Sequence, residues 1–158
     1  MRRLLIAASV IFVSVANAAE PPLLYLPLDG DSQPAIAAGP ARWQGGLLQY
    51  APGVRGMAAR LDSDCRLAAS DCMRAEAGTI ACWLRPLATP DAPGARYVFC
   101  RYGDRSVKNA WQTNRVSVTW VDKTLAMNVY PAQGGRPVSV EAAIDWPAGQ
   151  WRHLAATW

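Results

Sequence analysis

Apolar and polar residues alternate with a period of two along most of the chain. In segment 115–120 apolar side chains alternate with Arg, Ser and Thr, and after a polar turn at residues 122–123 the alternation resumes over 125–130. Successive side chains of a β-strand point to opposite faces, so this pattern predicts an antiparallel hairpin with one apolar face. No sequence window has apolar residues at helical spacing, which favours strands throughout.

The same alternation, interrupted by turn residues, predicts further strands. Pro27 lies inside the first of them and cannot donate a ladder hydrogen bond, which predicts that this strand lies at a sheet edge. About nine strands without a crossover helix predict an all-β fold, an antiparallel β-sandwich of two sheets packed face to face. These strands are expected at residues 23–28, 57–62, 79–85, 96–102, 138–145 and 151–158, with a short one at 47–50 inside a Gly- and Pro-rich loop at 39–56.

The N-terminus has the features of a secretory signal peptide. Arg2 and Arg3 precede an apolar run, and the small-x-small motif Ala16-Asn17-Ala18 closes it. We expect residues 1–18 to be cleaved, which leaves residues 19–158 as one domain that is secreted or periplasmic. The apolar run is shorter than the about 20 residues that a membrane-spanning helix needs, so no membrane span is expected after cleavage.

The charge of the chain argues against nucleic acid as a partner. The sequence has 16 Lys and Arg residues against 12 Asp and Glu residues, and removal of Arg2 and Arg3 with the leader brings the two totals closer together. Nucleic-acid-binding proteins concentrate basic residues on one face, whereas the arginines here are scattered singly along the sequence.

Four cysteines in an exported chain predict two disulfide bonds. Cys82 and Cys100 lie at comparable distances from a turn near residue 91, so we expect the strands around them to pair and the two residues to form a bridge. Cys65 and Cys72 bracket a short loop and form the second expected bridge, although three pairings are open. The spacings lack the close Cys-x-x-Cys pairs of zinc sites.

Four segments, in order, resemble the laminin G-like, concanavalin A-like lectin and glucanase superfamily. They are an opening strand that ends in Leu28-Asp29-Gly30, the glycine-led segment 56–62, the aromatic strand 78–87, and Gly149 to Trp158, which is the most specific match. The resemblance implies a jelly-roll sandwich that binds oligosaccharides or proteins, often with structural calcium and often as an accessory module of a larger exported enzyme. In that family several strands follow the last of these segments, so we expect the jelly roll to be incomplete at the C-terminus.

Carboxylate pairs for glycan hydrolysis are not recognisable in the sequence. Retaining glucanases of this fold carry Glu-x-Asp-x-x-Glu on one strand, and the nearest candidates here, Glu141 and Asp145, do not match that spacing. Two catalytic carboxylates must flank the scissile bond, so we interpret Glu141 and Asp145 as a solvated polar face. His153 is the sole histidine and has no nucleophile in a recognisable motif beside it, so a packing role is expected. No catalytic residue is predicted.

Aromatic residues supply the positive functional signal. Four tryptophans lie in strands or at family positions, so core packing is expected for Trp83, Trp120, Trp151 and Trp158. Trp111 lies instead in a polar loop, where alternation does not require a buried ring. The loop composition is typical of a saccharide-binding rim, although a Trp folded back over the sandwich explains it equally well. The predicted ligand-binding residues are Tyr102, Arg105, Asn109, Trp111 and Gln112.

Asp29 and Asp31 flank Gly30 after the first strand and are weak candidates for calcium ligands, because loop carboxylates suit Ca²⁺. Ordinary turn chemistry explains the Asp-Gly-Asp-Ser sequence as well and is the favoured interpretation. The sequence therefore predicts an exported, non-catalytic, lectin-like module with a glycan as its partner. A protein-binding or adhesive domain, and an accessory module of a glycan-active enzyme, are the alternatives.

Overall fold

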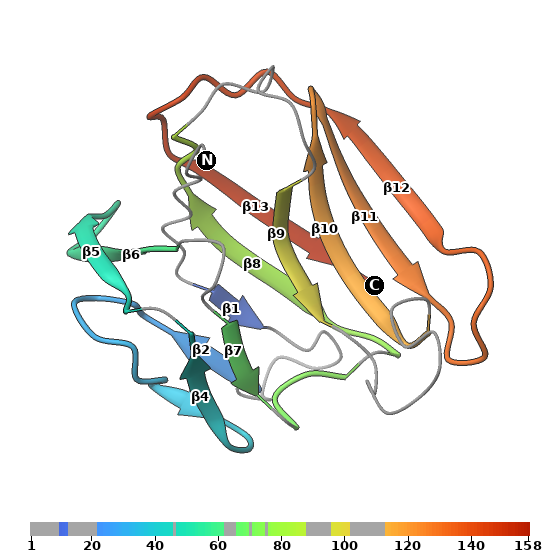
Figure 1. Ribbon diagram of the computed structural model, residues 1–158, viewed down its shortest axis with the longest axis horizontal. Helices are drawn as coiled ribbons and strands as arrows, with labels where there is room; N and C mark the ends of the chain where they lie inside the picture. Colours follow the sequence, from blue (N-terminus) through green and yellow to red (C-terminus); the bar gives the residue numbers. More distant parts are fainter. Residues whose placement is uncertain are drawn as a thin grey trace. The chain divides into compact units, whose positions relative to one another are not determined.

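The computed structural model describes residues 10–12, 22–45, 47–61, 66–69, 71–74, 76–87, 96–101 and 113–158. These residues form strands, turns and irregular segments without any helix, and every strand pair is antiparallel (Figure 1). The predicted all-β, antiparallel fold class is confirmed. The chain forms two compact units, residues 1–88 with 148–158 and residues 89–147, which are described separately.

The first unit contains a five-stranded sheet in the order β13-β8-β1-β2-β3. Its long strands β8 and β13 pair over their full length, from Thr79 opposite Thr157 to Leu84 opposite Arg152. The five strands are β13 (Arg152–Thr157), β8 (Thr79–Leu84), β1 (Val10–Phe12), β2 (Leu24–Leu26) and β3 (Ile36–Ala37).

Two small sheets complete the first unit. β4 (Ala41–Gln44) pairs with β7 (Arg66–Ala69), and β5 (Gln49–Pro52) pairs with β6 (Met57–Arg60). The β5–β6 turn contains Gly56 at φ +57°, a conformation that side chains rarely adopt. The segment expected to be a long loop therefore contributes two strands, of which the one near residue 50 was predicted.

The second unit contains one four-stranded sheet in the order β12-β11-β10-β9. Its strands are β9 (Arg96–Arg101), β10 (Arg115–Val121), β11 (Thr124–Tyr130) and β12 (Val138–Ala143). β10 and β11 pair in register from Arg115 opposite Tyr130 to Val121 opposite Thr124, which confirms the hairpin predicted from the alternation.

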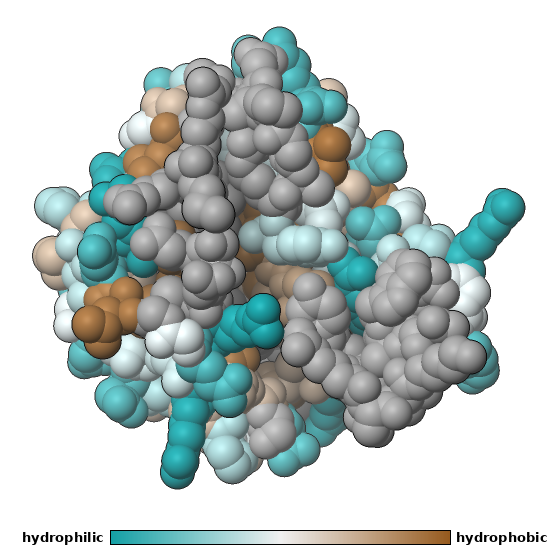
Figure 2. All heavy atoms as spheres, viewed as in Figure 1, coloured by the Kyte–Doolittle hydropathy of each residue, from teal (hydrophilic) through white to brown (hydrophobic). Residues whose placement is uncertain are grey.

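Each unit has an apolar core built from alternating strand residues. In the first unit Leu24, Leu26, Ile80 and Leu84 are at most 2% exposed. In the second, the predicted apolar face of β10 is buried, and its Trp120 ring meets the Trp146 ring edge-on at 5.9 Å between centroids. Exposed hydrophobic side chains form separate patches among hydrophilic ones in the part of the surface that Figure 2 colours.

Two predictions about strand position are wrong. β2 ends at Leu26, so Pro27 lies outside it, and β2 sits between β1 and β3 instead of at an edge. β8 and β9 do not pair with each other: β8 lies between β13 and β1, whereas β9 pairs with β10 in the other sheet. The predicted hairpin at this place assumed that strands adjacent in sequence are adjacent in space.

The predicted disulfides are not formed, because Cys72, Cys82 and Cys100 carry thiols. Sγ of Cys72 lies 3.5 Å from the carbonyl oxygen of Gly39, and Cys100 hydrogen bonds with Arg115. The Cys82–Cys100 prediction depended on the β8–β9 pairing, which fails. Cys65 lies outside the described residues.

Residues 10–12 of the expected signal peptide form β1, which pairs with β2 on one side and with β8 on the other. Val10 lies opposite both Leu26 and Cys82 in these two ladders. β1 therefore joins the β13–β8 pair to the β2–β3 pair through backbone hydrogen bonds. Cleavage after Ala18 stays a prediction.

Candidate functional site

A β-bulge sets the position of the first residue of the site. β9 and β10 pair regularly from Val116 to Val118, and then the register shifts so that Thr119 lies opposite Tyr97 and Val98 is the extra residue. A bulge of this kind re-aims side chains. Here it places Tyr97 on the face that carries Thr119, opposite the apolar face. The ring of Tyr97 is 49% exposed.

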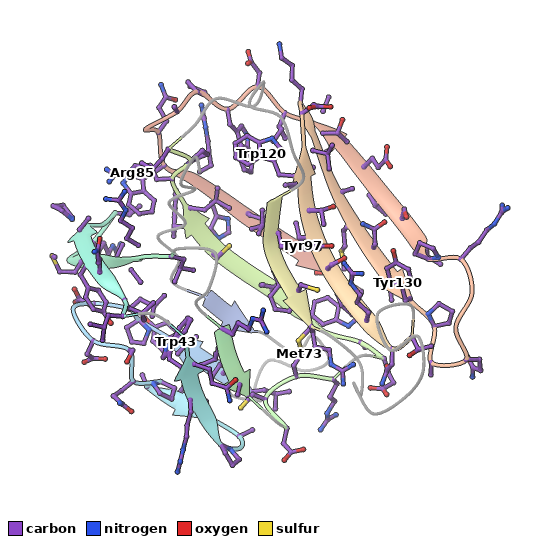
Figure 3. The ribbon with its side chains drawn as sticks, viewed as in Figure 1. Trp43, Met73, Arg85, Tyr97, Trp120 and Tyr130 are labelled. Carbon is purple, nitrogen blue, oxygen red and sulfur yellow. The ribbon has the colours of Figure 1, made fainter. Side chains whose placement is uncertain are left out.

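Arg115 lies between two tyrosine rings on this face. Its guanidinium carbon is 5.3 Å from the centroid of the Tyr97 ring and 5.3 Å from that of the Tyr130 ring, and its Nη2 donates a 3.1 Å hydrogen bond to the Tyr97 hydroxyl. Figure 3 labels the two tyrosines on β9 and β11. Such stacking on aromatic faces suits the planar guanidinium. We call Tyr97, Arg115 and Tyr130 the tyrosine–arginine cluster.

Arg115 and Tyr97 make contact although their positions in the ladder lie well apart. Arg115 is the first residue of β10, yet it contacts Tyr97, which lies opposite Thr119 four positions further on. Arg115 also hydrogen bonds with Cys100, the partner of Ser117 in the ladder. Arg115 is 7% exposed and Ser117 is 1% exposed.

Electrostatics keeps this buried arginine charged. Burial alone lowers the pKa of Arg115, but the interactions with Cys100 and Tyr97 outweigh it, so the pKa is raised from its ordinary value. Beneath it, Ser117 Oγ is buried and has no hydrogen-bond partner. The cluster thus presents a fixed cation between two aromatic rings.

Polar side chains continue across the face on β11 and β12. Asn128 lies opposite Ser117 on one side and opposite Ser139 on the other. The Ser139 hydroxyl donates a 2.7 Å hydrogen bond to Asn128 Oδ1, and the exposed Glu141 lies one pair further along. The face therefore combines exposed aromatic surface with amide, hydroxyl and carboxylate groups.

Carboxylates are few among the described residues of this face. Among the described residues of the face, Glu141 is the one carboxylate, whereas glycoside cleavage uses a pair on either side of the bond. Asp145 follows the end of β12 and is exposed, like Glu141. Aromatic rings with a few placed polar groups are typical of small-molecule binding sites.

The binding residues predicted from the sequence, Tyr102, Arg105, Asn109, Trp111 and Gln112, lie outside the described residues, so that prediction stays untested. The tyrosine–arginine cluster was missed. Its signal was present in the alternation, because Arg115, Ser117 and Thr119 share the polar face of β10. The alternation does not indicate that Arg115 and Ser117 are buried, which they are.

The two candidate calcium ligands both accept hydrogen bonds from backbone N–H groups. Asp29 Oδ1 accepts a hydrogen bond from the backbone N–H of Met57 and Asp31 Oδ1 accepts one of 2.9 Å from that of Gln33. A Cβ on Gly56 would lie 2.3 Å from Asp29 Oδ1, so this glycine permits the approach. No group of three His, Cys, Asp or Glu side chains suited to a metal occurs in the part of the chain that the structure describes.

The core role predicted for the tryptophans holds for Trp120 and is wrong for Trp83, which is 40% exposed. The Trp83 ring packs against exposed His153, its ladder partner, at 5.1 Å between centroids. Trp151 and Trp158 are half-buried. Arg85 stacks 5.2 Å from the Trp151 ring centroid, and Trp158 packs against Gly78. Trp83 is exposed because it lies on the outer side of β8 near the edge strand β13.

Searches of protein-family models, of curated proteins and of solved structures found no match to this chain. The resemblance to the laminin G-like superfamily therefore stays a prediction. The fold and the candidate site define an all-β protein in which one face of the β9–β12 sheet carries aromatic and polar side chains. Within the described ranges, no helix is long and apolar enough to cross a membrane.

Proposed function

We propose that this chain is an exported, non-catalytic carbohydrate-binding module and that the polar face of the β9–β12 sheet binds the saccharide. The observation that carries the proposal is the tyrosine–arginine cluster. Sugars present flat C–H faces, which stack on aromatic rings. The half-exposed ring of Tyr97 offers such a surface.

The cluster supports binding because it is held rigid before a ligand arrives. Arg115 fixes Tyr97 through its hydroxyl and contacts both rings. A preorganised site loses less side-chain entropy on binding. Asn128 and Ser139, already hydrogen bonded to each other, supply amide and hydroxyl groups of the kind that bind sugar hydroxyls.

Glycan-array binding of the purified protein, followed by calorimetry on the strongest ligand, tests the proposal. Tyr97→Ala removes the exposed ring, and we expect it to weaken binding at least about fivefold, because loss of stacking costs on the order of 1 kcal/mol or more. Both experiments are run with calcium and with a chelator, which also tests whether binding needs calcium. No binding to any saccharide in either condition rejects the function.

Trp83→Ala is the matched control. It removes an exposed aromatic ring from β8 in the other unit and should leave the saccharide affinity unchanged. Trp111→Ala tests the predicted loop rim in the same assay. Loss of binding in Trp83→Ala together with normal binding in Tyr97→Ala would move the site to the β8–β13 sheet and refute the assignment made here.

A further inference from the structure

The edge strand β12 is fully exposed and open on its outer side. All six of its residues are exposed, with Val138 at 72% and Val140 at 69%. β11 pairs with its inner side, and no described strand lies on the other. Backbone N–H and C=O groups on such an edge form a template for another strand.

β12 lacks the features that normally protect an edge. Monomeric proteins place charges, especially Lys, or Pro on edge strands. The opposite edge of the same sheet, β9, begins and ends with Arg, and β13 at the edge of the five-stranded sheet begins with Arg152 and His153. β12 carries no basic residue, no proline and one acid, Glu141.

The side chains on the two faces of β12 determine which strand can pair with its open edge. Val138, Val140 and Ala142 lie opposite Val129, Met127 and Leu125 of β11, so they extend the apolar face of the sheet. Ser139 and Glu141 lie on the polar face. A partner strand must present an apolar row beside the valines and must not bring an acid against Glu141.

A second copy of β12 meets both conditions in one antiparallel register. With the two-fold axis at Val140, Val140 faces its own copy, Val138 faces Ala142, and Ser139 faces Glu141. Pairing centred on Glu141 would set two carboxylates against each other, and pairing centred on Ser139 would shorten the ladder. Like charges directly opposite are destabilising, so the Val140 register is favoured.

We infer that two copies of this chain pair through β12 about a two-fold axis at Val140, forming a continuous eight-stranded antiparallel sheet. Each copy supplies the same surface, as closed two-fold dimers require. The pairing covers the exposed valines and satisfies the open backbone groups. It leaves Tyr97 and Arg115 outside the interface, since they lie on or beside β9 and β10.

Light scattering coupled to size-exclusion chromatography tests the inference on the purified chain over a hundredfold range of concentration. We expect the mass to double as the concentration rises. Val140→Lys places two lysines against each other at the axis, so this variant should stay monomeric. Val54→Lys makes the same substitution at another exposed valine, 45% exposed in a turn of the first unit, and should dimerise as the parent does.

Cysteine cross-linking tests the register. In Val140→Cys the two new thiols lie directly opposite each other, so mild oxidation should give a dimer band above the background of the parent chain. In Val138→Cys the new thiols are offset by four residues, about 13 Å, and should not cross-link. Both variants replace exposed side chains, and circular dichroism checks their fold.

Three results would overturn the inference. They are a monomeric parent at every concentration, a Val140→Lys variant that dimerises normally, and an open-ended series of larger species in place of a dimer. Equal cross-linking of the two cysteine variants would overturn the register. None of these outcomes depends on saccharide binding.

Discussion

Replacement of Arg115 tests whether its contacts or its charge hold the polar face together. Arg115→Lys keeps a buried cation but loses the flat, forked guanidinium, and Arg115→Met keeps most of the apolar stem but removes the charge. The Lys ammonium carries its three donors on a single nitrogen at the end of a flexible stem. It therefore cannot stack on both tyrosines and also donate to Tyr97.

The contacts of Arg115 give the expected losses in the free energy of unfolding. The two ring contacts at 5.3 Å stabilise by about 1 kcal/mol each, and the Tyr97 hydrogen bond adds about 1 kcal/mol. Arg115→Lys retains the desolvation cost of a buried cation and loses most of these contacts, so we expect a loss of about 2–3 kcal/mol. Arg115→Met loses the same contacts but removes the desolvation cost, so a loss of about 1 kcal/mol or less is expected.

Urea denaturation of the parent and of both variants measures these differences. The expected order of stability is parent, then Met, then Lys, and the Lys variant should melt lower by about 2–4 °C for each kcal/mol lost. Saccharide affinity should fall in both variants, because neither holds the Tyr97 ring. A Lys variant as stable as the parent would show that charge alone suffices and would refute the stacking argument.

Three further predictions concern the first unit. Burial raises the pKa of the Cys82 thiol to about 12, so above pH 9 the unfolded chain releases a proton that the folded chain keeps. Stability should therefore fall by about 1.4 kcal/mol per pH unit between pH 9 and 12 relative to Cys82→Ala, and equal pH slopes in urea titrations would contradict this. A Cβ on Gly78 would lie 2.6 Å from Trp158 Cζ2, so Gly78→Ala should cost about 1–3 kcal/mol, and Trp158→Phe should relieve part of that cost in a double-mutant cycle. Deletion of residues 1–18 removes β1, and faster hydrogen exchange at the amides of β2 and β8 should follow, whereas unchanged protection would mean that β1 contributes no ladder bonds.

Elements with a clear local sequence pattern could be predicted, whereas pairings between strands far apart in the sequence could not. The β10–β11 hairpin could be predicted because its two strands and their short turn are contiguous and alternate strictly. The neighbours of β8 could not, since β1 and β13 are far away in sequence and no local pattern encodes which strands meet. The edge position predicted from Pro27 was wrong because the pattern located the strand correctly but not its last residue.

The candidate site was only partly encoded in the pattern. Alternation places Arg115 on the polar face of β10, but it does not indicate that this side chain contacts a tyrosine whose ladder partner lies four residues further along β10. That contact also needs the bulge at Val98, which turns Tyr97 to the same face. A bulge changes the register by one residue and has no reliable sequence signature when the extra residue is apolar like its neighbours.

The proposed export of this chain would affect both residues 1–18 and the buried thiols. With residues 1–18 in place, β1 fills the position between β2 and β8, and Cys72 and Cys82 are buried thiols. Cleavage after Ala18 would remove the strand that separates β2 from β8, and their facing edges would then be open to each other or to another strand. An exported chain would meet oxidising conditions at the same stage. Cys82 lies opposite Val10 of β1, so loss of that strand would leave the backbone of β8 at Cys82 without this ladder partner. Comparison of the reactivity of Cys82 in the full chain and in a chain that lacks residues 1–18 tests whether loss of β1 makes this buried thiol accessible to oxidation.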